Sequence, residues 1–92
     1  MGYTAWQTTN PDYLDTDGLC DISVTDDDDK SSGRPVWHAK TRVLATALGV
    51  DPGAHARVNI ETAHLLAEAG WEFAGDWENC PSGAFIAVRR AE

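Results

Sequence analysis

Apolar and polar residues alternate along the segment from Leu19 to Thr25. The apolar positions are Cys20, Ile22 and Val24, and the polar positions between and after them are Asp21, Ser23 and Thr25. This two-residue period predicts a β-strand with one buried face. A weaker strand is predicted over Tyr3 to Thr9, and the Asn10-Pro11-Asp12 and Asp17-Gly18 segments predict turns between the two strands.

The apolar spacing changes to three and four residues between residues 34 and 69, which predicts two helices. The first is predicted from Gly33-Arg34-Pro35 to Gly49, with the proline in its first turn and the glycine as its stop. The second is predicted from Asn59, a good N-cap residue, to about Ala69. Its buried side is expected to hold Ile60, Ala63, Leu66 and Ala67, and its solvent side Glu61, His64 and Glu68. Residues 50–58 are expected to form a loop.

From Trp71 onwards the period returns to two and predicts a β-hairpin. Its first strand has an aromatic face that is expected to be buried, formed by Trp71, Phe73 and Trp77. Pro81-Ser82-Gly83 is the predicted turn, and residues 84–90 return as the second strand. This arrangement places Arg89 or Arg90 opposite Glu72 as a cross-strand ion pair.

Together these elements predict an α+β domain in which two helices pack on a small antiparallel sheet. The C-terminal hairpin forms that sheet, and the N-terminal strands are candidate further members. We expect one domain over residues 1–92, because a chain of 92 residues is too short for two hydrophobic cores. Residues 1–33 form an acidic strand and loop segment, and residues 34–92 form a helix-loop-helix-hairpin core.

The order helix, loop, helix, hairpin resembles the core of a winged helix-turn-helix protein, and Leu44-Ala45-Thr46-Ala47-Leu48-Gly49-Val50 looks like the first helix and turn of many bacterial repressors. The resemblance implies a DNA-binding regulator as an alternative function. Two features depart from it: the loop is longer than the usual three or four residues, and the second helix presents Glu61, His64 and Glu68 where basic or amide side chains are needed.

Charge is distributed unevenly along the chain. Seven basic and 15 acidic residues give a formal net charge of -8, and the first 29 residues hold eight Asp without any Lys or Arg. Asp26, Asp27, Asp28 and Asp29 are adjacent, and four like charges must be solvated or bound by a partner. Direct binding of nucleic acid is not expected, because a chain with this charge and no basic stripe offers little attraction to phosphate.

The acidic segment therefore supplies the predicted binding site. We expect a small non-enzymatic regulator or inhibitor that uses this segment to bind a basic surface on a partner protein, such as a protein that handles nucleic acid. The predicted contact residues are Trp6, Asp21, Asp26, Asp27, Asp28 and Asp29. Trp6 is the tryptophan expected to be partly exposed, since it lies on the weaker strand. The alternative interpretation of the Asp run is a solvated loop that keeps the protein soluble.

No motif for a metal, a cofactor or catalysis is present in the sequence. The three histidines lack ligand spacing, and an EF-hand template centred on Gly18 fails at both ends, with Tyr13 and Val24 where acidic ligands are required. Cys20 and Cys80 are expected to be separate thiols, with a disulfide between them left open. The chain carries neither a membrane-spanning run nor a secretory leader, so we expect a cytoplasmic location.

Overall fold

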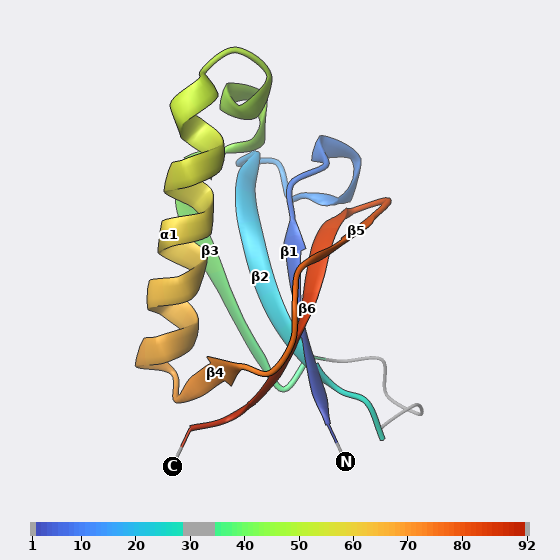
Figure 1. The fold of residues 1–92 in the computed structure, drawn as a ribbon. Helices are drawn as coiled ribbons and strands as arrows, with labels where there is room; N and C mark the ends of the chain where they lie inside the picture. The colour runs from blue at the N-terminus through green and yellow to red at the C-terminus, as the bar shows by residue number, and fades with distance from the viewer. Residues whose placement is uncertain (1, 29–34, 92) are drawn as a thin grey trace.

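The structure is a computed structural model that describes residues 2–28 and 35–91. In these residues, six strands form one curved antiparallel sheet, a half-barrel, and one α-helix packs against one of its faces (Figure 1). The elements are β1 (Tyr3–Thr8), η1 (Pro11–Tyr13), β2 (Leu19–Asp26), β3 (Trp37–Leu44), η2 (Ala45–Gly49), α1 (Pro52–Glu68), β4 (Trp71–Phe73), β5 (Glu78–Cys80) and β6 (Gly83–Arg90). The strand order is β3-β2-β1-β6-β4, and β5 also pairs with β6.

The two N-terminal strands lie in the middle of the sheet. β1 pairs with β2 on one side and with β6 on the other, both antiparallel. The buried residues of β1 are Ala5 and Gln7, and those of β2 are Cys20, Ile22 and Val24, so both strands bury every second residue on the face that α1 covers. The predicted alternation in this part of the chain is confirmed.

The first predicted helix is wrong, because residues 37–44 form strand β3 at the edge of the sheet. Ala39 and Val43 lie four residues apart and satisfy the helical period, but they also satisfy a two-residue period that includes Thr41 between them. Thr41 is buried and its Oγ1 donates to the carbonyl oxygen of Cys20 at 3.0 Å. A buried polar residue thus hid the alternation. The C-terminal part of this segment is the short 3₁₀ helix η2.

The helix α1 begins eight residues before the predicted start, since its N-cap is Asp51 and not Asn59. Asp51 is its N-cap, with a side chain that accepts a hydrogen bond from the backbone N–H of Gly53 at 2.9 Å, and Pro52 occupies the first helical turn. Asp followed by Pro is a strong helix-start signal. Residues 52–58, expected as a loop, are therefore helical.

The buried side of α1 also differs from the prediction. The residues with full burial are Ala54, Val58, Thr62 and Leu66, at a spacing of four. Ile60, Ala63 and Ala67 were expected on this side but are exposed, whereas Leu66 is buried as predicted. Both sets of residues form apolar stripes at helical spacing, so the sequence pattern alone cannot decide which of them faces the sheet.

The C-terminal hairpin is confirmed, with a break in its first strand. Glu72 pairs with Arg89 in the register and through an ion pair, as predicted. Phe73 is opposite Val88 and Glu78 is opposite Phe85, so five steps along β4–β5 match three steps along β6. The two extra residues form a bulge that divides the strand into β4 and β5.

The predicted fold of two helices on a small sheet is thus corrected to a strand-rich half-barrel with a single α-helix in the described residues. The element order of a winged helix-turn-helix is absent from them, because its first helix is a strand. The core has two parts along α1: one includes Leu66, Trp71 and Ile86, and the other includes Cys20 and Val58. No helix in residues 2–28 and 35–91 is long and apolar enough to cross a membrane.

Candidate interaction surface

A groove runs between α1 and the β4–β5 segment (residues 71–80), on the same side of the sheet as the helix. It consists of two neighbouring hollows, a largely apolar one of about 240 Å³ and a more polar one of about 300 Å³. The rings of Phe73 and Trp77, one in each hollow, contact each other edge to face with centroids 5.9 Å apart. We call these hollows the apolar end and the polar end of the groove.

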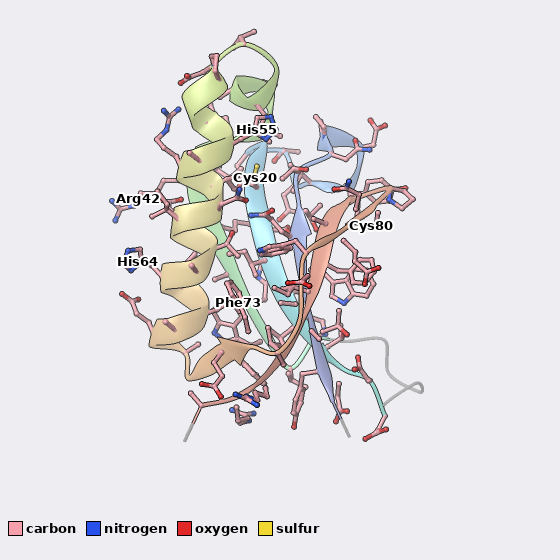
Figure 2. All side chains as sticks on the ribbon, viewed as in Figure 1. Cys20, Arg42, His55, His64, Phe73 and Cys80 are labelled. Atoms are coloured by element: carbon pink, nitrogen blue, oxygen red, sulfur yellow. The ribbon has the colours of Figure 1, made fainter. Side chains whose placement is uncertain are left out.

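The apolar end places exposed hydrophobic side chains on both walls. On the strand side Phe73 is 43% exposed, and it contacts Trp77, which is 36% exposed and lies in the neighbouring polar end. On the helix side, Ala63 and Ala67 line the hollow and continue into the exposed stripe of α1 that includes Ile60, which is 57% exposed. Figure 2 labels Phe73 and shows His64 on the outer side of α1, pointing away from the sheet. A continuous apolar surface of this kind is typical of a protein interaction site.

The polar end is organised around Gln7, a buried residue of β1. Its Nε2 donates to Oγ1 of Thr62 at 2.8 Å, and it also lies 3.3 Å from Oδ1 of Asn59. The Thr62 hydroxyl in turn donates to the carbonyl oxygen of Val58 at 2.8 Å. Because these residues belong to β1 and α1, the network joins the helix to the centre of the sheet and fixes the position of one wall of the groove.

Gly83 forms part of the same end, where β6 begins. A side chain at this position would collide with the chain, because a Cβ atom would lie 2.2 Å from the carbonyl oxygen of Gln7. Its φ angle of 154° is also one that other residues rarely adopt. A glycine therefore permits the close approach of β6 to β1 beneath the groove.

The β4–β5 segment, which forms the strand side of the groove, is acidic. Residues 71–80 contain Glu72, Asp76 and Glu78 and no Lys or Arg. Arg89 pairs with Glu72, while the guanidinium of Arg90 lies over the ring of Trp71 at 4.4 Å from its centroid. Within the described residues, no ion pair involves Asp76 or Glu78, so the β4–β5 segment carries unbalanced negative charge.

Two of the residues predicted from the sequence, Trp6 and Asp21, lie on the outer face of the sheet, the face away from α1. Trp6 is partly buried: it packs against Phe85 with ring centroids 5.2 Å apart, and its Nε1 donates to Oγ1 of Thr25 at 2.9 Å. Asp21 lies 3.7 Å from Nε2 of His38 on β3. This face thus presents the Trp6–Phe85 pair beside polar and charged side chains such as Thr25, Asp21 and His38.

The remaining predicted residues are found at the far end of β2. Asp26 accepts a hydrogen bond from the backbone N–H of Asp28 at 2.9 Å, and Asp27 accepts one from Oγ1 of Thr4 at 2.7 Å. Asp29 lies outside the described residues. Asp21 and Asp26 are five residues apart on one strand, or about 16 Å, and they point to opposite faces. The structure therefore does not gather the predicted residues into one site.

The acidic segment also contains an ion-pair cluster that the sequence did not predict. Lys40 of β3 contacts Asp15 at 2.8 Å and Asp17 at 3.1 Å. The backbone N–H of Leu19 and the ammonium of Lys40 hold the pKa of Asp17 below its ordinary value. The hydrogen bond to Asp15 in turn raises the pKa of Lys40. Part of the negative charge of the first third is thus balanced within the fold.

The two cysteines are free thiols, as expected. Cys20 is buried beneath α1, and burial, followed by the charge of Asp21, raises the pKa of its thiol. Cys80 lies in β5, where its Sγ is 3.4 Å from Oγ of Ser82. In residues 2–28 and 35–91, no group of three or more His, Cys, Asp or Glu side chains is arranged to hold a metal ion.

Sequence reasoning missed Gln7, Phe73 and Trp77 as candidate functional residues. The two aromatic residues follow the same alternation as Trp71, and for that reason they were assigned to the core. The signal that could have separated them is Gly75-Asp76, a glycine and a charge between two aromatic residues, which is typical of a bulge. Gln7 occupies a buried position in the alternation of β1, and a long polar side chain there indicates a partner within the core.

Comparison of the chain with protein-family models, with curated proteins and with solved structures finds no match.

Proposed function

We propose that this protein is a non-enzymatic binding protein, a regulator or inhibitor, that holds a basic amphipathic helix of a partner protein in the groove between α1 and β4–β5. The observation that carries the proposal is the exposed Phe73–Trp77 pair, in which Phe73 lines the same hollow as Ala63 and Ala67 of α1. Aromatic side chains in such a position are the usual anchors of protein interfaces.

The two apolar stripes of α1 support this proposal. One stripe, which includes Val58 and Leu66, covers the sheet, and the other, which includes Ile60 and Ala63, is exposed. A surface helix of a globular protein needs a single apolar face. The second stripe is explained if a partner covers it, and its small alanine side chains allow a partner helix to approach closely.

The charge of the β4–β5 segment favours a basic partner. This segment contains Glu72, which lines the apolar end, together with Asp76 and Glu78, and the chain as a whole has a formal net charge of -8. A helix with Lys or Arg on the borders of its apolar face would be attracted to this acidic segment. Such attraction speeds association and weakens as salt rises.

The test uses a 17-residue peptide, equal in length to α1, in which Leu and Lys are placed at amphipathic helical spacing. We expect it to bind the protein, to shift the NMR signals of Phe73 and Trp77, and to bind more weakly at high salt. The double variant Phe73→Gln/Trp77→Gln should lose affinity by about tenfold or more, the loss typical of an interface anchor. A Leu/Glu peptide of the same pattern should not bind.

Two control variants make the test specific. Tyr13→Gln/Val50→Gln removes two exposed apolar residues outside the groove and should leave the affinity unchanged. Asp26→Asn/Asp27→Asn/Asp28→Asn tests the acidic segment that the sequence favoured. If the second control loses affinity and the groove variant keeps it, the proposed groove is wrong and the partner binds at the end of β2.

A further inference from the structure

We propose that the polar end of the groove is a pocket for a planar, uncharged carboxamide group, which stacks on Trp77 and hydrogen-bonds to Gln7 and Asn59. The inference goes beyond the docking proposal, since a small free amide can test it without any partner helix. It rests on a cavity of about 300 Å³ lined by these three residues, with Asn79 and His55 at its border.

The orientation of the Gln7 amide follows from its neighbours. The hydroxyl of Thr62 has a single proton, and it gives this proton to the carbonyl oxygen of Val58, which can only accept. Thr62 must therefore accept from Gln7, which places the Nε2 of Gln7 toward α1. The Oε1 of Gln7 is then the atom left without a hydrogen-bond partner in the described part of the chain.

This oxygen is available to a ligand. Gln7 as a residue is only 5% exposed, yet no fully buried side-chain oxygen or nitrogen in the described residues lacks a partner. Its Oε1 must therefore reach accessible space, and Gln7 lines the pocket. A nearly buried residue with one free acceptor at a cavity wall is a prepared hydrogen-bonding position.

Asn59 supplies the complementary donor. Its Oδ1 is directed to the Nε2 of Gln7, so its Nδ2 group is free to donate. The pocket thus offers one acceptor and one donor from neighbouring residues, beside the indole of Trp77. A carboxamide carries an N–H next to a C=O in one plane and satisfies both positions while its flat surface packs on the ring.

Charged groups form fewer hydrogen bonds with the acceptor of Gln7 and the donor of Asn59. A carboxylate has no proton for the Oε1 of Gln7, and a guanidinium has no acceptor for the Nδ2 of Asn59. Each would leave one polar atom of the pocket without a partner, which weakens binding strongly. The carboxamide can come from a Gln or Asn side chain of a docked segment or from a free small molecule.

Benzamide is the probe, with benzoate and acetophenone as near-isosteric controls. We expect saturable shifts in the side-chain amide signals of Gln7 and Asn59 and in the indole signal of Trp77 with benzamide. Binding should be weaker by about tenfold or more with benzoate, and similarly with acetophenone, which lacks the N–H. Asn59→Ala and Trp77→Leu should each weaken benzamide binding, and both are exposed positions at which the fold tolerates change.

Equal binding of the three probes, or no binding of benzamide, would overturn the pocket. The second arm uses the Leu/Lys peptide with one Gln or one Glu at the position that faces the polar end. If benzamide binds and the Gln peptide is not favoured over the Glu peptide, the amide comes from a free molecule. The docking proposal is tested separately with the single variant Phe73→Gln, because Phe73 lines the apolar end and this substitution removes no atom of the polar pocket.

Discussion

Trp71 and Trp77 lie six residues apart in the same part of the hairpin, and they have opposite environments. Trp71 is 3% exposed and packs against Tyr3 and the guanidinium of Arg90, whereas Trp77 is 36% exposed and contacts Phe73. Trp71 precedes the bulge and lies in the core cluster beneath α1, while Trp77 follows the bulge. Both tryptophans fit the alternation of apolar and polar residues along the strand. Trp71 is part of the core because it packs in the cluster with Leu66 of α1.

The helix α1 likewise has a buried apolar stripe and an exposed one. Leu66 belongs to the core cluster that contains Trp71. Ala63 and Ala67 line the open hollow beside Phe73. A single helix does not cover both halves of a six-stranded sheet, so one half is buried by the fold while Phe73 and Trp77 at the other half remain partly exposed.

The largest expected effect is the difference in the free energy of unfolding between variants of the two tryptophans. Trp71→Ala should lower the free energy of unfolding by about 3–5 kcal/mol, because it leaves a cavity in the core. Trp77→Ala should change it by less than about 1 kcal/mol, as substitutions at exposed positions do. Urea denaturation followed by far-UV circular dichroism measures both. Since Trp71→Ala can unfold a small domain altogether, Trp71→Phe serves as a milder variant. Equal losses at the two positions would contradict the comparison.

A smaller effect is expected where the two halves meet, at the Gln7–Thr62 hydrogen bond. Thr62→Val removes the acceptor at almost constant volume and should destabilise the protein by about 1–3 kcal/mol, because a buried amide N–H loses its best partner. The double variant Gln7→Leu/Thr62→Val should recover most of this loss, since two apolar groups replace two polar ones. A double-mutant cycle from urea denaturation checks the coupling. Additive losses would show that the bond does not join the helix to the sheet.

Local patterns in the sequence predicted the strands β1, β2 and β6 and the Glu72–Arg89 pair. The two-residue period is clear in β2 and weaker in β1, and β6 begins at the end of the predicted Pro81-Ser82-Gly83 turn. The pattern failed at β3, where Ala39 and Val43 suit two periods at once. It failed again at α1, where the sequence contains two apolar stripes at helical spacing and the pattern alone does not show which of them is buried. Both errors concern which side chains of a segment face the core. That choice is decided by packing against residues that are distant in the sequence.

The candidate groove could not be predicted for the same reason. Its residues come from β1, α1 and β4–β5, which the sequence places far apart, and a hollow exists only where a helix and a sheet edge leave space between them. The acidic residues were easier to notice because they are adjacent in the chain. The structure distributes them instead over both faces of β2 and pairs Asp15 and Asp17 with Lys40.

The smallest expected effect concerns the N-terminal end of α1, the helix that covers one half of the sheet. The guanidinium of Arg57, and then the N–H of Gly53, hold the pKa of Asp51 below its ordinary value of 3.8. A carboxyl group with a lowered pKa stabilises the folded state above the ordinary value, and this contribution is lost as pH falls through the folded-state pKa. Asp51→Asn keeps a good N-cap but removes the charge. Its urea midpoint should therefore lie slightly below that of the wild type near neutral pH and coincide with it in strong acid. A difference that stays constant over this range would show that the charge of Asp51 does not hold the end of α1.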